Sequence, residues 1–297
     1  MTMPKKTDST IRHEMSVGRA NTPDFSWPTV FLALGLLSAF TGAVLLAVNG
    51  VIPYLAAAAI NTIVIYAIYT VMHEAVHMNI SSRRKNLQWV DYTLGSLAGV
   101  LLWQFFDHHR ADHLVHHRAT NHDDDPDISA RAGLFGYLFL KLPVVLLSYF
   151  NPVALYRRCQ ELQMSRGRTL RSMVGFAFNT ALALAIVAFG YGYELLTLWF
   201  VPWWIGQSVM LLMFTWSPHH DHKETSRYRN TRVVEMPGGN ALLLGQGYHL
   251  IHHMMPGIPW YRYKNTFDEL RPILEQHDVR IEGVVPNPNP RPASEVS

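Results

Sequence analysis

Four long stretches of the chain carry no charged side chain. The first two lie between Asp24 and Glu74, and a turn signal at Asn49-Gly50 separates them. The other two lie on either side of Glu194, after Arg171. Each stretch is long enough to cross about 30 Å of hydrocarbon as an α-helix. The pattern therefore predicts four membrane spans in two hairpins, at about residues 28–48, 51–72, 173–193 and 195–216.

Two further apolar stretches are weaker. Residues 87–106 include Asp91, and residues 134–150 include Lys141 and Pro143. We expect both to lie in the membrane interface or to dip partly into the bilayer, although the first could form a fifth span. A buried helix pair in a soluble protein is the alternative for the charge-free stretches, and it is disfavoured because four such stretches are rare outside membranes.

The polar segments predict the organisation around these spans. We expect an N-terminal segment at 1–27, a membrane domain at 28–265, and a C-terminal helix with a disordered tail at 266–297. All 25 Lys and Arg residues lie in 1–26, 74–172 and 217–297, which four spans place on one side. The positive-inside rule makes that side cytoplasmic. The predicted fold is an all-α integral protein of the cell inner membrane, with both termini and a helical cap in the cytoplasm.

Composition narrows the possible chemistry. Charged residues make up 16% of the chain, below the roughly 25% of soluble domains. The net charge of +3 is too small to indicate a nucleic-acid-binding protein. The single cysteine excludes a disulfide framework and any cluster held by several cysteines.

The 16 histidines are the unusual feature, and none falls inside a predicted span. Most recur at i, i+3 or i, i+4 spacing, which places imidazoles on one face of a helix. Neutral imidazole binds iron, zinc and copper. The three histidine boxes, at residues 73–77, 113–117 and 249–253, hold too many histidines for one ion. They suit two metals a few ångströms apart. The predicted ligands are His73, His77, His113, His116, His117, His219, His249, His252 and His253.

The remaining histidines and nearby acids are expected to play supporting or surface roles. His13 and His277 lie in polar surroundings, and a supporting or surface role is expected for His108, His109, His122, His220 and His222. Carboxylates that hydrogen-bond ligand histidines fix their tautomers. The candidates are Glu74, Asp91, Asp112, Asp125 and Asp127, each of which could equally be a surface or capping acid. Asp91 stands out because an acid within an apolar segment usually has a partner.

The order HxxxH, HxxHH, HxxHH and the two hairpins resemble the membrane fatty-acid desaturase superfamily of non-haem di-iron enzymes. The resemblance covers about residues 30–265. Two stretches resemble sequence motifs of carotenoid β-ring hydroxylases of the cyanobacterial type. They are His113-Leu-Val-His116-His117 with Thr120-Asn121 and Asp125-Pro126-Asp127, and Gly245-Gln-Gly-Tyr-His249-Leu-Ile-His252-His253 with Pro256 and Trp260. The segment Trp216-Ser-Pro-His219 after the last span also resembles a motif of the family.

This resemblance implies two iron ions held by the nine histidines, with O2 as co-substrate. The implied reaction attacks an unactivated C–H bond of a membrane lipid, with hydroxylation of a carotenoid β-ring as the first expectation. Electrons would come from a separate ferredoxin-type donor with its reductase, because one cysteine excludes a fused cysteine-rich donor domain. Arg227, Arg229 and Arg232 could dock an acidic donor or could simply be a positive-inside flank.

Other functions remain open at this point. A fatty-acyl desaturase, a hydroxylase or an oxidative decarboxylase that forms terminal alkenes would use the same histidine boxes. The segment from His73 to His77 also fits HExxH, the motif of zinc metalloproteases, here of an intramembrane type. A protease would leave the two HxxHH boxes unexplained. A metal transporter would require polar residues inside the spans, and these spans have almost none.

Overall fold

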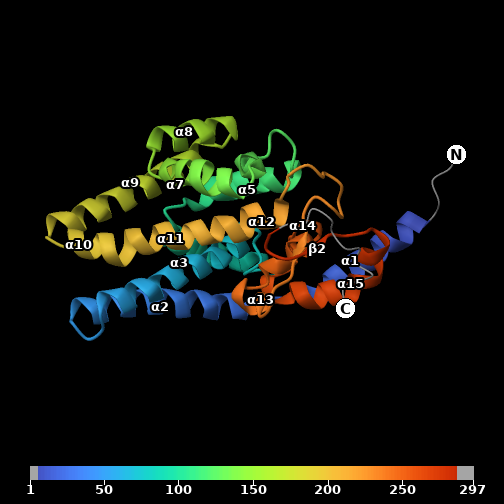
Figure 1. The fold of residues 1–297 in the computed structure, drawn as a ribbon, viewed down its shortest axis with the longest axis horizontal. Helices are drawn as coiled ribbons and strands as arrows, with labels where there is room; N and C mark the ends of the chain where they lie inside the picture. The colour runs from blue at the N-terminus through green and yellow to red at the C-terminus, as the bar shows by residue number, and fades with distance from the viewer. Residues whose placement is uncertain (1–5, 286–297) are drawn as a thin grey trace.

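The computed structural model describes residues 6–285, and four long apolar helices dominate it (Figure 1). They are α2 (Trp27–Val48), α3 (Tyr54–Val76), α9 (Arg166–Ala188) and a continuous helix from Gly192 to His219. The last consists of α10 (Gly192–Leu195), η4 (Leu196–Phe200), α11 (Val201–Met210), η5 (Leu211–Trp216) and α12 (Ser217–His219), where η4 and η5 are π-helical. The four helices have 22, 23, 23 and 28 residues, so each is long enough to cross a bilayer.

The four helices form two hairpins, as the charge pattern predicts. Gly50 has φ 71° in the turn between α2 and α3, and Gly190 has φ 90° in the turn between α9 and α10. This left-handed conformation costs glycine little, which explains why each turn contains one. Both turns lie at the same end of the molecule (Figure 1). The prediction of an all-α membrane fold with four spans is confirmed.

The helices are unequally buried, which identifies an inner and an outer pair. In the apolar window of α3, 56% of the residues are buried, and in that of the last helix 50%, against 17% for α2 and 11% for α9. The inner pair packs closely because Gly206 lies against α3, where an added Cβ would meet the Thr62 carbonyl at 2.8 Å. Asn61 also donates a hydrogen bond of 2.7 Å to the Leu198 carbonyl across this contact. The outer pair presents exposed apolar side chains such as Phe31 and Phe178, as expected toward lipid.

The two weaker apolar stretches form shorter helices beside this core. α4 (Gln88–Leu102) has 15 residues and ends at Trp103, whose φ of 56° turns the chain into α5 (Phe106–Ala119). The second stretch forms α6 (Leu134–Gly136), η3 (Tyr137–Lys141) and α7 (Leu142–Ser148), which meets α8 (Pro152–Glu161) at an angle of 88°. A bend this sharp makes the pair a broken span or a re-entrant segment, so the structure has four spans, or five if this pair counts as one.

A helical cap forms the end of the molecule opposite the hairpin turns (Figure 1). It has its own apolar core, which includes Val17, Leu250, Phe267 and Ile281. Its elements are α1 (Lys6–Asn21), η1 (Lys85–Leu87), η2 (Pro126–Arg131), β1 (Val233–Val234), α13 (Gly239–Leu242), η6 (Gln246–Tyr248), α14 (His249–Met254), η7 (Trp260–Arg262), α15 (Tyr263–Gln276) and β2 (Ile281–Glu282). The strands β1 and β2 pair in parallel and are too short to leave an alternating pattern in the sequence. The tail predicted after residue 285 lies outside the described residues.

Candidate metal centre

The structure gathers all nine predicted histidines into two groups at the junction of the spans and the cap. In each group, one ligand-type atom per residue lies within 4.8 Å of the others. We call these groups the first and second clusters. The first cluster is His73, His77, His113, His117 and His252, and the second cluster is His116, His219, His249 and His253.

Helix geometry divides each HxxHH box between the two clusters. His113 and His117 lie four residues apart on α5 and both join the first cluster, while His116 joins the second. α14 is divided the other way, because His249 and His253 join the second cluster and His252 joins the first. Consecutive residues on a helix point about 100° apart, so the two histidines that end each box face different clusters. The spacing of a box predicts imidazoles on one face of a helix, and the structure shows that the three imidazoles of each HxxHH box do not share one cluster.

Short contacts between ring nitrogens run through both clusters. In the first cluster, the Nε2 of His113 lies 3.0 Å from that of His77, and the Nε2 of His117 lies 2.8 Å from that of His252. In the second cluster, the Nε2 of His249 lies 3.0 Å from that of His219 and 3.1 Å from that of His253. The clusters also adjoin, since the ring centroids of His117 and His253 are 4.3 Å apart.

This donor set fits a metal ion in each cluster. A neutral imidazole carries only one N–H, so converging Nε2 atoms cannot all satisfy one another by hydrogen bonding. Both ring nitrogens of His73 are buried and find no hydrogen-bond partner among residues 6–285. Burial lowers the pKa of His113, His117, His249, His252 and His253 well below the ordinary value, and neighbouring histidines add to this shift. These five rings are therefore neutral and keep the lone pairs that iron, zinc or copper would accept.

Three ligand-type histidines are oriented through their Nδ1 atoms. The Nδ1 of His116 lies 2.8 Å from the Oδ1 of Asp125, which also accepts the backbone N–H of Asp127, while the Oδ2 accepts that of Asn121. Burial opposes protonation of His116, but Asp127 and Asp125 outweigh it and raise its pKa. The Tyr263 hydroxyl lies 3.0 Å from the Nδ1 of His252, and the Thr120 hydroxyl lies 3.3 Å from the Nδ1 of His253. Such contacts fix the ring orientation and the tautomer.

The sequence reading proposed five acids, and they have different surroundings. Asp125 contacts His116 directly, and Asp127 lies 3.6 Å from the same ring. Asp91 instead accepts the backbone N–H groups of Ile80 and Ser81, so it holds the loop after α3. Asp112 pairs with Arg158 at 2.8 Å, and Glu74 accepts the backbone N–H of Trp260 at 3.2 Å. Tyr263 and Thr120 were not predicted, because no local spacing connects them with the histidines that they contact.

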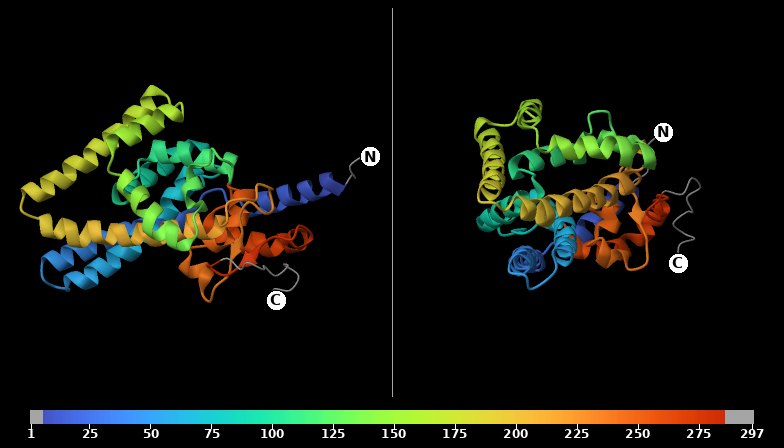
Figure 2. Two further views of the ribbon diagram at one scale, coloured as in Figure 1. Left: turned by 45° about the horizontal axis from the view of Figure 1, so that its top comes forward. Right: turned by 60° about the vertical axis from the view of Figure 1, so that its left-hand side comes forward.

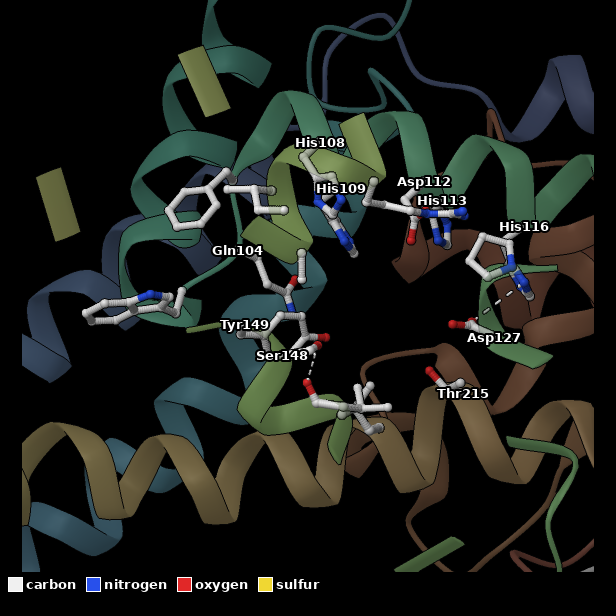
Figure 3. A pocket seen from close by; sticks show the side chains of 18 of the residues that line it. Gln104, His108, His109, Asp112, His113, His116, Asp127, Ser148, Tyr149 and Thr215 are labelled. Atoms are coloured by element: carbon white, nitrogen blue, oxygen red, sulfur yellow. Dashed lines mark hydrogen bonds and ion pairs between the residues drawn. The ribbon is translucent and has the colours of Figure 1, made fainter. Parts of the chain in front are cut away.

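A cavity of 510 Å³ borders both clusters through His113 and His116 (Figure 3). Aromatic side chains line much of it, including Tyr69, Trp103 and Tyr149. Gln104 is 3% exposed, and neither the oxygen nor the nitrogen of its side-chain amide hydrogen-bonds to any described residue. The other polar side chains that line the cavity include His108, His109, Asp112, Asp127, Ser148 and Thr215. The sequence predicts a supporting or surface role for His108 and His109, and the structure places both in the lining of this cavity.

Comparison with known proteins places this chain in a family. The sequence model of the family described as fatty acid desaturase matches residues 49–283. The chain belongs to this family. Over 215 residues it is 24% identical to a beta-carotene ketolase of Paracoccus sp. (strain N81106 / MBIC 01143), which covers 67% of the chain and 73% of that protein. Over 114 residues it is 29% identical to a chloroplastic omega-3 fatty acid desaturase of Brassica napus, with 33% of the chain and 28% of that protein covered.

Membership in the fatty acid desaturase family confirms the predicted class. The protein is a membrane oxidoreductase of a family that uses iron and acts on lipids, and its histidine clusters could hold metal. The zinc protease and the metal transporter, which the sequence left open, gain no support from the family or from its two relatives.

Replacing Glu74 with glutamine should leave the metal content of this desaturase-family protein unchanged. Glu74 lies outside both clusters, and glutamine keeps an oxygen that can accept the N–H of Trp260. Metal per chain in the purified variant, measured by mass spectrometry against the unaltered protein, checks this expectation. Loss of metal from the variant would show that Glu74 is itself a ligand or an essential support.

Proposed function

We propose that the protein binds one iron ion in each cluster and uses O2 to oxidise an unactivated C–H bond of a membrane lipid. The observation that carries the proposal is the convergence of nine imidazoles on two adjoining points beside a cavity. An all-histidine site for two ions matches the ligand set that the resemblance to di-iron desaturases implies. The family's use of iron and its lipid substrates support the same reading.

The chain's own residues have three tasks in this reaction. The nine histidines hold the ions, and Asp125 and Tyr263 orient two of the rings. The aromatic lining of the cavity excludes water and packs against an apolar substrate. Bound iron would supply the activation of O2 needed to break a C–H bond, while the protein selects which carbon lies closest to the clusters.

We propose a carotenoid substrate first, with hydroxylation of a β-ring as the reaction. The similarity to a beta-carotene ketolase spans two thirds of the chain and supports a carotenoid. The sequence motifs around His113–His117 and His249–His253 support a β-ring hydroxylase. The unpartnered amide of Gln104 would provide a polar contact for an oxygen atom on the substrate or product.

A fatty-acyl reaction is the second candidate, and the similarity to an omega-3 fatty acid desaturase favours it. This candidate comprises desaturation, hydroxylation or oxidative decarboxylation of an acyl chain. The same clusters would serve these reactions, so the distinction depends on which lipid enters the cavity.

The proposed location is the cell inner membrane, with both termini and the metal centre on the cytoplasmic side. All 25 Lys and Arg residues lie in the segments that flank the spans on one side, and the hairpin turns have none. The proposed electron source is a separate ferredoxin-type protein with its reductase.

Lipid analysis of a bacterial host that accumulates β-carotene tests the proposed reaction. The host would express the chain with a ferredoxin and its reductase, and one extract would be analysed for carotenoids, fatty acids and alkenes. The inactive control is His252→Ala, and the matched control is His122→Ala, which removes an exposed histidine outside both clusters. New hydroxylated carotenoids with unchanged acyl chains are expected. New acyl products with unchanged carotenoids would select the second candidate, and no new product of either kind would overturn the proposal.

A further inference from the structure

A second large hollow lies on the cap, away from the cavity that borders the metal clusters. This groove, which we call the cap groove, has a volume of 860 Å³ and runs along α1 toward the ends of α14 and α15. Both α1 and α15 lie at the end of the molecule opposite the hairpin turns (Figures 1 and 2). The cap groove is therefore outside the membrane-spanning part of the fold, where a water-soluble protein can reach it.

The cap groove reaches the metal centre by a very short covalent path. Met254 and Met255 line it and directly follow His253, a member of the second cluster. Arg227, which also lines the groove, donates a hydrogen bond of 3.4 Å to the Met254 carbonyl. One peptide bond thus separates the lining of the groove from a candidate metal ligand.

The walls of the cap groove are apolar and adaptable. Met15 and Ile11 of α1 are about half exposed in it, and Met255 lies against Gly18, where an added Cβ would meet its sulfur at 3.3 Å. Methionine side chains are flexible and polarisable, and they are common at surfaces that accept a partner protein. A hollow with such walls suits docking better than tight binding of a small polar ligand.

The rim of the cap groove is positively charged. Arg19, Arg83 and Arg227 line it, against a single lining carboxylate, that of Glu14. Glu14 is 2% exposed and accepts hydrogen bonds from both Arg227 and Tyr228, so the charges of Glu14 and Arg227 offset each other and the net positive charge of the rim comes from Arg19 and Arg83. The exposed carboxylate of Asp24 forms an ion pair of 3.7 Å with Arg83 and offsets part of its charge. Exposed guanidinium groups of this kind attract an acidic partner and speed its association.

We propose that the cap groove docks an acidic one-electron carrier of the [2Fe–2S] ferredoxin class, and that electrons enter the metal centre through Met254 and His253. The inference rests on the proposed function, which requires an external donor. Hydroxylation of R–H consumes O2, two electrons and two protons and gives R–OH and water. Desaturation consumes the same two electrons and gives an alkene and two waters. Each carrier gives one electron and leaves oxidised, so two must dock for each product.

The structure also separates the three arginines that the sequence suggested for donor docking. Arg227 lines the cap groove. Arg232 is fully buried in an ion pair with Glu282, so it cannot meet a partner. Arg229 donates to the Asp278 carbonyl and does not line the groove. The docking surface is thus built mainly by α1, which the sequence did not indicate, and Arg83 joins it from the loop before α4.

Charge reversal on the rim tests the proposal. The groove variant is Arg19→Glu with Arg83→Glu, and the matched control is Arg166→Glu with Arg168→Glu at the exposed start of α9. The iron-loaded full chain would be placed in phosphatidylcholine nanodiscs, and binding of an acidic plant-type [2Fe–2S] ferredoxin would be measured by calorimetry. We expect Kd to rise at least tenfold in the groove variant and to stay unchanged in the control. We also expect binding to the unaltered protein to weaken as salt rises.

Two outcomes would overturn the proposal. One is an equal Kd for the groove variant and the unaltered protein, and the other is equal weakening in the groove variant and the control. An anionic lipid is the competing occupant: unchanged ferredoxin binding, with loss of phosphatidylglycerol adducts in native mass spectrometry, would assign the groove to lipid instead. Iron content and turnover with a chemical reductant should be unchanged in the groove variant. Absence of iron or turnover in every form would count against the proposed function, while the binding comparison would still decide the docking site.

Discussion

The His252→Ala variant is expected to lose its metal and all measurable turnover. The Nε2 of His252 lies 2.8 Å from that of His117, and its ring centroid lies 4.2 Å from that of His73, so this ring closes the first cluster. Removing a group that only orients a ligand typically costs 10–100-fold in metal affinity or activity. Removing a ligand should cost more than about 100-fold. Metal per chain and product formation in the same purified sample provide the measurement.

Tyr263→Phe is the graded companion to this variant. It removes only the hydroxyl that lies 3.0 Å from the Nδ1 of His252 and leaves the imidazole in place. We expect metal affinity to fall by about 10–100-fold.

If His252→Ala retained metal and activity equal to those of the unaltered protein, His252 would not be a ligand.

The Arg232→Met variant is expected to lose about 3 kcal/mol of stability, because it removes one of two cationic partners of the buried Glu282 carboxylate and the hydrogen bonds that Arg232 donates to the Ser217 and Val284 carbonyls. The Arg232 and Glu282 side chains are 0% and 1% exposed and lie 2.7 Å apart. Arg280 also contacts Glu282, which places the expected loss at the lower end of the range for buried pairs. Equilibrium unfolding in detergent micelles measures the free-energy difference.

Arg229→Met is the control for this prediction, because it removes an arginine from the same segment that is partly exposed. It pairs with the partly exposed carboxylate of Glu224 at 3.8 Å, so the loss should stay below about 1 kcal/mol. Arg232 also donates to the Ser217 carbonyl, two residues before His219. We therefore expect weaker metal binding in the Arg232 variant and unchanged metal binding in the control. Equal stability of the two variants would contradict the prediction.

The membrane part of the fold was predictable because its signals are local. Missing charges mark the helices, and Asn49-Gly50 and Gly190 mark the turns. Helix boundaries were harder to predict: α9 begins at Arg166, earlier than the charge-free stretch, and ends at Ala188, because the charge-free residues after it form the turn. A helix can extend into the interface with exposed arginines, and hydropathy alone does not show this.

The site was predictable only where helix periodicity determines it. The spacing within each box places its histidines on one or two turns of a single helix, but the convergence of the boxes and the surroundings of Tyr263 and Gln104 depend on how distant segments pack. Arg232 illustrates the same limit. The neighbours of Arg232 in the sequence suggest a basic surface segment. In the structure Arg232 is buried, because it pairs with Glu282 on β2, a strand distant in the sequence.

The division of each HxxHH box between two clusters has a mechanical consequence. α5 and α14 each contribute histidines to both clusters, so neither helix can shift at one cluster without shifting at the other. The separation of the two points is set by the rotation between neighbouring residues on one helix, which side-chain substitutions elsewhere leave unchanged. The two helices therefore fix the distance between the clusters, so residues that line the cavity can be substituted without altering that distance.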